Sequence, residues 1–209
     1  MIQYLLFDLD NTLYSSRYGL EQNVSRRITE FTAGYLGLSQ EEAAKLRAKR
    51  IAFYGTTLEW LMAEEGLNDV DHYFRMIHPE DEAEILPPDP ALGEFLEGIK
   101  LPKAILTNSP MEHAGRVLAR LGIRSCFGSI FDIRWNNFKG KPRPDVYGRV
   151  LACLNSSLET TLFIDDYPKY IAGYLALGGK GLLLDENNEH PAHQGPRIRE
   201  LRELSLYLD

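Results

Sequence analysis

The stretch Phe7-Asp8-Leu9-Asp10-Asn11-Thr12-Leu13-Tyr14 (FDLDNTLY) places two carboxylates two residues apart, directly after an apolar run. Residues 3–7 are short, apolar and aromatic, which is typical of a buried strand, and Asp8 falls where this strand is expected to end. Continued extended backbone would turn Asp8 and Asp10 to the same side. Two carboxylates this close repel each other, so another part of the chain or a ligand has to supply positive charge.

Four later segments have the same strand character, and they are residues 103–107 (KAILT), 129–133 (SIFDI), 160–164 (TTLFI) and 180–184 (KGLLL). Helical patterns lie between them, at 144–154, at 169–177 and after Ser109-Pro110-Met111-Glu112, where Ser109 is expected to be the N-cap. Strands that alternate with helices in this way predict an α/β fold. We expect a doubly wound parallel sheet with helices on both faces.

Residues 15–88 interrupt this alternation, because they contain helical patterns and almost no strand-like run. We therefore predict an α/β core of residues 1–14 and 89–209 and an inserted all-helical cap of residues 15–88. Within the cap, Ser39–Glu42 and Thr56–Glu59 have the pattern of capping boxes. An insertion after the first strand would lie above the C-terminal edge of the sheet, where doubly wound domains bind their ligands.

Several polar side chains are expected to meet at that edge, and they are Asp8, Asp10, Thr107, Asn108, Lys141, Asp165 and Asp166. Hard oxygen ligands in an acidic cluster suit Mg²⁺. A phosphate would complete the charge balance, with the metal on one side and Thr107 and Lys141 on the other. Asp8 is then placed to attack phosphorus as a nucleophile, shielded by the metal from the anion that it attacks.

Four motifs in order carry a resemblance to a known superfamily, and they are DLDNT (8–12), LTNS (106–109), GKPRPDVY (140–147) and FIDD (163–166). With them the chain resembles the haloacid dehalogenase-like hydrolases. The resemblance implies that Asp8 becomes an aspartyl phosphate. It also implies that Asp10 protonates the leaving oxygen, then activates water, and binds Mg²⁺ through its backbone carbonyl.

The same resemblance gives roles to the other matched positions. Thr107 and Asn108 would hold the phosphoryl group, and Lys141 would stabilise its charge and the nucleophile. Asp165 and Asp166 would bind or orient the metal. Lys139 competes with Lys141 for the lysine role, and Pro142 favours Lys141 because it matches the family pattern.

The identity of the residue at position 10 narrows the reaction. Members that cleave carbon–halogen bonds carry, by resemblance, another residue there, so Asp10 favours phosphoryl chemistry. Tyr54–Leu58 (YGTTL) and residues 85–92 (ILPPDPAL) are similar to the pyrimidine 5′-nucleotidases, cytosolic enzymes that release phosphate from nucleoside monophosphates. The segment after Asp166 departs from the family, because Tyr167-Pro168-Lys169-Tyr170-Ile171 stands where many relatives have an Asn-Ile pair.

Three function classes stay open on the sequence. The leading one is a nucleoside 5′-monophosphate phosphatase. Another phosphatase or a phosphomutase, acting on a metabolite such as phosphoglycolate or a sugar phosphate, would use the same machinery. A non-catalytic phospho-acceptor such as a receiver domain also joins carboxylates, Thr and Lys around Mg²⁺, but it is about half this long and has no helical insertion after its first strand.

Other polar and aromatic residues are interpreted as structural. The five histidines show no ligand spacing, so no metal role is expected for them. Arg47, Lys49 and Arg50 are expected on a solvated helix face, and Phe53, Trp60 and Leu61 in the core of the cap.

Composition limits the partners and the compartment. The 23 Lys and Arg against 30 Asp and Glu give a net charge of −7, which argues against binding to nucleic acid polymers or to anionic membranes. Only two cysteines occur, Cys126 and Cys153, and they have no metal-type pairing. A cytoplasmic protein that binds a small phosphorylated metabolite is therefore expected. The sequence predicts no particular oligomeric partner.

Overall fold

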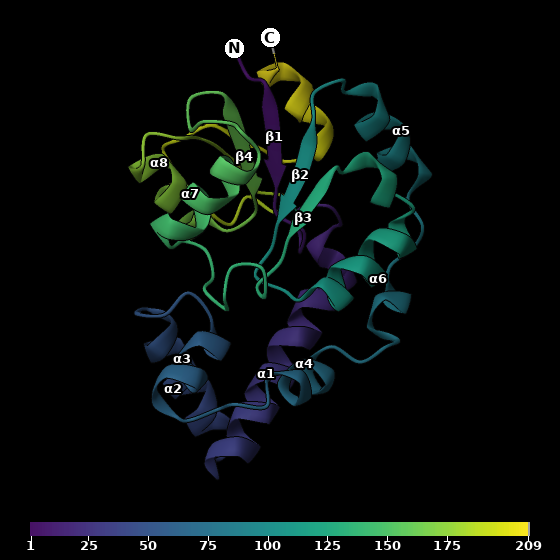
Figure 1. The fold of residues 1–209 in the computed structure, drawn as a ribbon. Coiled ribbons are helices and arrows are strands. Elements are labelled where there is room, and N and C mark those ends of the chain that lie inside the picture. The colour runs from purple at the N-terminus through teal and green to yellow at the C-terminus, as the bar shows by residue number, and fades with distance from the viewer. Residues whose placement is uncertain (209) are drawn as a thin grey trace.

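The computed structural model describes residues 1–208, and its centre is a six-stranded sheet of order β3-β2-β1-β4-β5-β6 (Figure 1). The strands are β1 (Tyr4–Phe7), β2 (Lys103–Leu106), β3 (Ser129–Phe131), β4 (Thr161–Asp165), β5 (Lys180–Leu184) and β6 (Arg197–Ile198). Every neighbouring pair is parallel. The predicted doubly wound α/β architecture is confirmed.

The register of the central strands determines where the site lies. β1 lies between β2 and β4, and Phe7 is paired with Ile105 on one side and Ile164 on the other. The strands run in the same direction, so the residues that follow Phe7, Leu106 and Ile164 emerge at one edge of the sheet. This edge is where doubly wound folds place their ligands.

Helices cover both faces of the sheet, with α5 (Pro90–Gly98) and α6 (Met111–Leu121) on one and α7 (Pro144–Cys153) and α8 (Pro168–Ala176) on the other (Figure 1). The alternation of side chains along β1 explains the two layers. Leu5 and Phe7 belong to the apolar cluster that includes residues of α5 and α6, whereas Leu6 belongs to the cluster of α7 and α8.

The C-terminal segment adds the sixth strand. Residues 197–198 form β6, which pairs with β5, and a 3₁₀ helix follows at Leu201–Tyr207. Two residues are too few to show the alternation by which a strand is recognised in a sequence. Ile198 is nevertheless buried in the core.

A helical module follows β1 and is formed by α1 (Leu20–Leu36), α2 (Gln40–Ile51), α3 (Thr57–Glu64) and α4 (Val70–Ile77). Short 3₁₀ helices precede it at Ser16–Tyr18 and follow it at Glu82–Ile85. Buried Trp60 and Leu61 belong to an apolar cluster made mostly of module residues. Phe53, expected in that core, is 76% exposed, because α2 ends at Ile51 and the chain turns outward.

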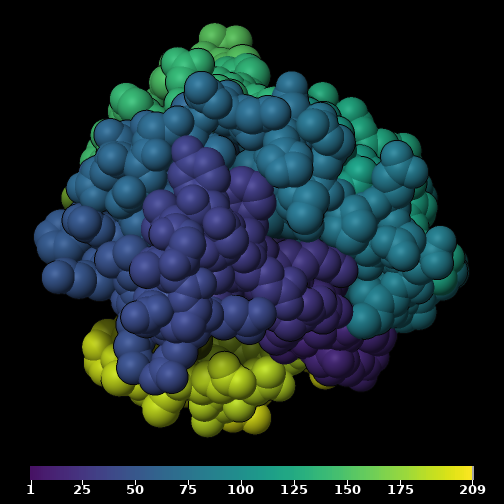
Figure 2. Space-filling model, turned by 90° about the horizontal axis from the view of Figure 1, so that it is seen from below, coloured from purple at the N-terminus to yellow at the C-terminus, as the bar shows by residue number. Residues whose placement is uncertain are grey.

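The module lies at the carboxyl edge of the sheet, at the end opposite to the two chain termini (Figure 1). In the view from below, its purple and blue atoms cover the middle of that face (Figure 2). Leu20 and Ala83, near its two ends, pack in the core beside the sheet. The domain division at 15 and 88 therefore stays a prediction.

The helix caps show why the helices begin where they do. Ser39 and Glu42 form the predicted capping box, with the Ser39 N–H donating to Glu42 Oε2 over 2.9 Å. Asp89 accepts a hydrogen bond from the Leu92 N–H and caps α5. The longest helix, α1, has 17 residues. Among residues 1–208, no helix combines the length and apolar character that crossing a membrane requires.

Candidate active site

A cavity of about 440 Å³ lies at the carboxyl edge, between the sheet and the helical module. The strand ends and the loops that follow them contribute Asp8, Asp10, Thr107, Asn108, Lys141 and Asp166 to its wall. The module contributes polar groups as well, among them Glu21, Arg47, Thr57 and Tyr73. Residues far apart in the sequence therefore meet around one cavity, and all the predicted site residues except Asp165 line it.

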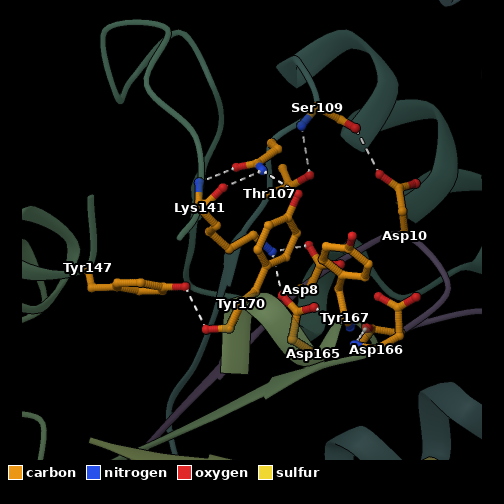
Figure 3. Close-up of polar contacts among 12 residues, drawn as sticks. Asp8, Asp10, Thr107, Ser109, Lys141, Tyr147, Asp165, Asp166, Tyr167 and Tyr170 are labelled. Carbon is orange, nitrogen blue, oxygen red and sulfur yellow. Dashed lines mark hydrogen bonds and ion pairs between the residues drawn. The ribbon is translucent and has the colours of Figure 1, made fainter. Parts of the chain in front are cut away.

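Lys141 forms the centre of the charged site (Figure 3). Its ammonium donates to Asp8 Oδ1 over 2.6 Å and to Asp165 Oδ2 over 2.7 Å, and all three side chains are buried. Burial by itself lowers the pKa of Lys141, but Asp165 and Asp8 outweigh this effect and raise it. Lys141 is therefore a fixed positive charge. Lys139 instead pairs with Asp145 at the surface, over 3.0 Å.

Three carboxylates, those of Asp8, Asp165 and Asp166, have oxygen atoms within 4.8 Å of one another. Burial raises the pKa of all three. When all three are ionised, three carboxylates against the single Lys141 ammonium leave an excess of two negative charges, which burial disfavours. A divalent cation with oxygen ligands fits this donor set. Asp165 already accepts hydrogen bonds from Lys141 and from the Tyr167 N–H, so Asp8 and Asp166 are the carboxylates that face the cavity.

Asp10 is held separately, on the side of the cavity next to α6 (Figure 3). Its carboxylate accepts hydrogen bonds from Tyr14 at 2.7 Å and Ser109 at 2.8 Å, and His113 Nε2 lies 2.7 Å from Oδ1. Burial by itself raises the pKa of Asp10, but His113, Tyr14 and Ser109 hold it well below its ordinary range. The chain turns directly after Asp10, where Asn11 has a φ of 54°.

The prediction that Ser109 caps α6 is wrong. The N-cap residue is Pro110, which has no side-chain cap bond, and the N–H of Met111 donates instead to Asp132 Oδ2 over 3.0 Å. This acceptor comes from the loop after β3, so a local pattern could not reveal it. Ser109 is free of the cap and its hydroxyl donates to Asp10.

Thr107 and Asn108 follow β2 and have different surroundings. The Thr107 hydroxyl accepts from the Ser109 N–H over 3.0 Å, which leaves its own proton for another acceptor. The Asn108 side chain accepts from the Lys141 N–H over 2.7 Å and donates to the Tyr170 hydroxyl over 3.1 Å. Asn108 therefore ties the Lys141 segment to β2. This role is not visible in the sequence, and phosphate binding by Asn108 stays a prediction.

Sequence reasoning missed the buried histidines. His78, Glu82 and His113 form a second group whose ligand atoms lie within 4.8 Å of one another. His78 and Glu82 are at i and i+4, but His113 lies 35 positions after His78, so no spacing rule connects all three. One signal was available, because His113 lies next to Ala114 on the buried stripe of α6. A titratable residue on an apolar face needs buried polar partners.

Arg47 was also assigned wrongly to a solvated face. Its guanidinium reaches the cavity wall, where it donates to the Ser25 carbonyl over 3.0 Å and to the Thr57 hydroxyl over 3.2 Å. The module side of the cavity thus contains a partly buried cation.

The comparison with protein families agrees with this geometry, because the model for haloacid dehalogenase-like hydrolases matches residues 2–176. The chain belongs to the haloacid dehalogenase-like hydrolase family. Hydrolases of this family generally use Mg²⁺, and the Asp8, Asp165 and Asp166 carboxylates provide a suitable acidic group.

Individual relatives of this haloacid dehalogenase-like hydrolase are distant. Phosphate metabolism protein 8 of Saccharomyces cerevisiae is 28% identical over 186 residues, which cover 82% of this chain and 58% of the yeast protein. The L-2-haloacid dehalogenase of Xanthobacter autotrophicus has a TM-score of 0.66 at 16% identity, covering 100% of this chain and 98% of that one. A HAD phosphatase of Thermococcus onnurineus has a TM-score of 0.61 at 18% identity, covering 99% and 98%. The two structures show a shared fold.

Proposed function

We propose that this hydrolase is a Mg²⁺-dependent phosphomonoesterase that works through an aspartyl phosphate on Asp8, and that its substrate is a nucleoside 5′-monophosphate. The observation that carries the proposal is the pairing of two carboxylates in one cavity. Asp8 lies 2.6 Å from the Lys141 ammonium, whereas Asp10 is held apart by neutral and cationic donors. Such different surroundings let one carboxylate act as nucleophile and the other carry protons.

In the first step Asp8 attacks phosphorus, and the ester P–O bond breaks. Asp10 is ionised in the ligand-free site, so it takes up a proton as the monoanion of the substrate binds and gives this proton to the leaving oxygen, since an alkoxide is a poor leaving group. Lys141 would balance the negative charge of the phosphoryl oxygens, and the Thr107 hydroxyl would donate a hydrogen bond to one of them. Mg²⁺ held by Asp8 and Asp166 would supply further positive charge for the phosphate.

In the second step a water molecule attacks the phosphorus of the aspartyl phosphate. Asp10, now ionised, takes a proton from that water, and the bond between phosphorus and Asp8 breaks. Inorganic phosphate leaves, Asp8 is a carboxylate again, and Asp10 regains its proton. The net reaction is the addition of one water to the ester, giving an alcohol and phosphate.

Two features support hydrolysis of a phosphate ester rather than removal of a halide. A halide leaves without a proton, so dehalogenation would have no use for a carboxylate such as Asp10 beside the nucleophile. The yeast relative has a name that refers to phosphate metabolism.

The shape and the walls of the cavity support a small substrate. Its volume of about 440 Å³ lies within the range of about 300–1,000 Å³ that is usual for small-molecule sites. On the module side, the Arg47 guanidinium and the Glu21 carboxylate offer polar contacts, and Tyr73 offers an aromatic surface. These groups are suited to the sugar and base of a nucleotide, so we propose that the helical module acts as a cap that selects the substrate.

The test is phosphate release with Mg²⁺ from UMP, CMP, purine monophosphates, phosphoglycolate and a sugar phosphate. We expect multiple turnovers on UMP or CMP and a loss of at least about 10³-fold in Asp8→Asn, because the nucleophile is removed. Asp145→Asn makes the same change outside the cavity and should retain activity. Preference for another ester would reject the nucleotide proposal, and single phosphorylation without turnover would reject hydrolysis.

A further inference from the structure

A buried polar chain extends from Asp10 away from the cavity. His113 comes from α6, is fully buried and has Nε2 2.7 Å from Asp10 Oδ1. Its other ring nitrogen, Nδ1, lies 2.9 Å from Glu82 Oε1, although the angle is poor for a hydrogen bond. Glu82 is fully buried and belongs to the 3₁₀ helix at Glu82–Ile85, between the helical module and α5. None of these contacts is needed to hold the nucleophile.

Glu82 is itself fixed from two further sides. Arg116 donates to its Oε1 over 2.6 Å, and His78 Nδ1 lies 2.9 Å from its Oε2. Each group in the chain therefore has a partner of suitable charge or hydrogen-bonding character. Because Arg116 already occupies the Glu82 oxygen nearest to His113, the group is better explained as an ion-pair network than as a metal site.

The network restricts the orientation of the Asp10 carboxylate. Both carboxylates beside the His113 ring accept hydrogen bonds only, so the ring presents N–H groups on both sides. Burial lowers the pKa of His113, but Asp10 and Glu82 raise it to about 10. Packing on α6 and the close contact to Glu82 restrict the ring, and the ring in turn restricts the Asp10 carboxylate.

We propose that His113 is a positioning residue that aims the Asp10 carboxylate at the leaving oxygen, and that Glu82 orients the His113 ring for this purpose. The proposal rests on the proposed phosphatase function. Proton transfer needs a donor within hydrogen-bond reach and in line with the oxygen, and misplacement by about 1 Å costs about 10²-fold in rate. Tyr14 and Ser109 hold the carboxylate from other directions, so His113 completes its support.

The test compares two esters that differ in their need for a proton. UMP releases a basic alkoxide, whereas p-nitrophenyl phosphate releases a weakly basic phenolate. We expect His113→Leu to lower kcat on UMP by about 10²-fold with KM nearly unchanged, and on p-nitrophenyl phosphate by less than about 10-fold. His113→Gln, whose amide can donate to Asp10, should have a kcat on UMP at least about 10-fold higher than His113→Leu. Glu82→Gln, like His113→Leu, should lose more kcat on UMP than on p-nitrophenyl phosphate.

His72→Leu is the matched control, because His72 is exposed on α4 and makes no contact with Asp10. Equal losses on both esters in His113→Leu would mean a general structural role and would overturn the inference, as would a loss of less than about threefold on UMP. A stoichiometric zinc ion that survives dialysis and disappears in His78→Leu would also overturn it, since the cluster would then be a metal site.

A measurement without turnover separates this inference from the proposed function. In proton NMR, we expect a slowly exchanging ring N–H resonance of His113 that is lost in His113→Gln and shifts in Asp10→Asn. A resonance that does not respond to Asp10→Asn overturns the inference. If wild type hydrolyses neither ester while this resonance behaves as expected, the proposed function fails and the contact between His113 and Asp10 stands.

Discussion

At the scale of single residues, the site is a set of buried charges that neutralise one another. Lys141 is fully buried, which is rare for lysine, and its ammonium is within 2.7 Å of two carboxylates. Removing one partner of a buried ion pair leaves the others unpaired and costs about 3–5 kcal/mol. The charge that promotes the proposed reaction is therefore also a condition for a stable core.

The first residue-scale prediction concerns this lysine. Lys141→Met should lower the free energy of unfolding by about 3 kcal/mol in metal-free buffer, because Asp8 and Asp165 are left facing each other. Added Mg²⁺ should restore part of the loss by binding these carboxylates. Urea unfolding with and without Mg²⁺ measures both effects.

Lys139→Met is the control for the stability measurement. The ion pair of Lys139 with Asp145 is exposed, and such pairs contribute at most about 1 kcal/mol. Equal stabilities of the Lys139 and Lys141 variants would contradict the assignment of Lys141 as the internal counter-charge.

The second residue-scale prediction concerns the pH dependence that Glu82 contributes. Burial raises the pKa of Glu82, but His113 and His78 outweigh burial and hold it well below its ordinary value. A depressed pKa in the folded state adds stability above the unfolded-state pKa, about 4.3, and this stability is lost as the pH falls below it. The free energy of unfolding of wild type should therefore exceed that of Glu82→Gln by about 3 kcal/mol at pH 7, and this difference should be smaller at pH 4.

Urea unfolding of both proteins at pH 7, 5 and 4 gives the difference directly. Using the difference cancels the contributions of groups that both proteins share, such as Asp8 and Asp166. A gap that stays constant or widens on acidification would show that Glu82 is not held as a carboxylate by its neighbours.

At the scale of secondary-structure elements, the sheet and most of the site follow from local pattern. Residues 180–184 form a strand exactly as long as expected, because the apolar run there is bounded by clear turn residues on its N-terminal side. Asp8, Thr107 and Asp166 each follow a strand, so the parallel sheet brings them together without further information.

What the sequence did not reveal arises from contacts between distant elements. Ser109 fits a capping pattern, but Asp132 from another loop makes the cap bond and leaves Ser109 to Asp10. Glu82 and His113 meet only because the 3₁₀ helix at Glu82–Ile85 packs against α6. Phe53 is apolar but lies beyond the end of α2, so composition alone placed it in the wrong environment.

A close approach of two loops joins the start of α3 to the Lys141 segment. A Cβ built on Gly140 would lie 2.6 Å from Thr56 Cγ2 and 3.0 Å from Asn108 Oδ1. A Cβ on Gly55 would lie 2.8 Å from the Gly140 carbonyl oxygen. Glycine is therefore required where the helical module touches the loop that carries the lysine.

The element-scale prediction tests this contact. Gly140→Ala should cost about 1–3 kcal/mol of stability, because the new methyl group forces Thr56 and Asn108 apart. It should also lower kcat/KM, since Asn108 bonds to the backbone of Lys141. Urea unfolding and steady-state kinetics measure the two effects on the same preparation.

Gly148→Ala is the matched control in α7, where a Cβ meets nothing within 4 Å. It should stabilise the protein by about 0.4–1 kcal/mol through the lower entropy of the unfolded chain, with unchanged kinetics. If Gly140→Ala behaved like Gly148→Ala, the loops would have room to separate and the contact would not constrain the site.

At the scale of the whole molecule, the helical module restricts access to the reacting groups. It is joined to the sheet domain by an ion pair between Glu59 and Arg143 over 2.8 Å and by a hydrogen bond from Lys169 to the Ile51 carbonyl over 2.9 Å. These contacts flank the cavity, and module atoms cover the same face in Figure 2. Such a cover would exclude bulk water from the proposed aspartyl phosphate and would limit the size of the substrate.

The whole-molecule prediction is therefore that the protein distinguishes substrates by size when the reacting phosphomonoester is the same. UMP and a 5′-phosphorylated decauridylate present the same phosphomonoester, but the chain of the second cannot fit a cavity of about 440 Å³. We expect kcat/KM on the decamer to be at least about 10²-fold lower than on UMP, measured as phosphate release.

The net charge of −7 would also repel the polymer, so the assay is repeated at high salt, which screens repulsion between exposed charges but leaves the cover in place. If salt restored hydrolysis of the decamer, charge and not the helical module would control access. Equal rates on both substrates at low salt would show that the site is open to polymers.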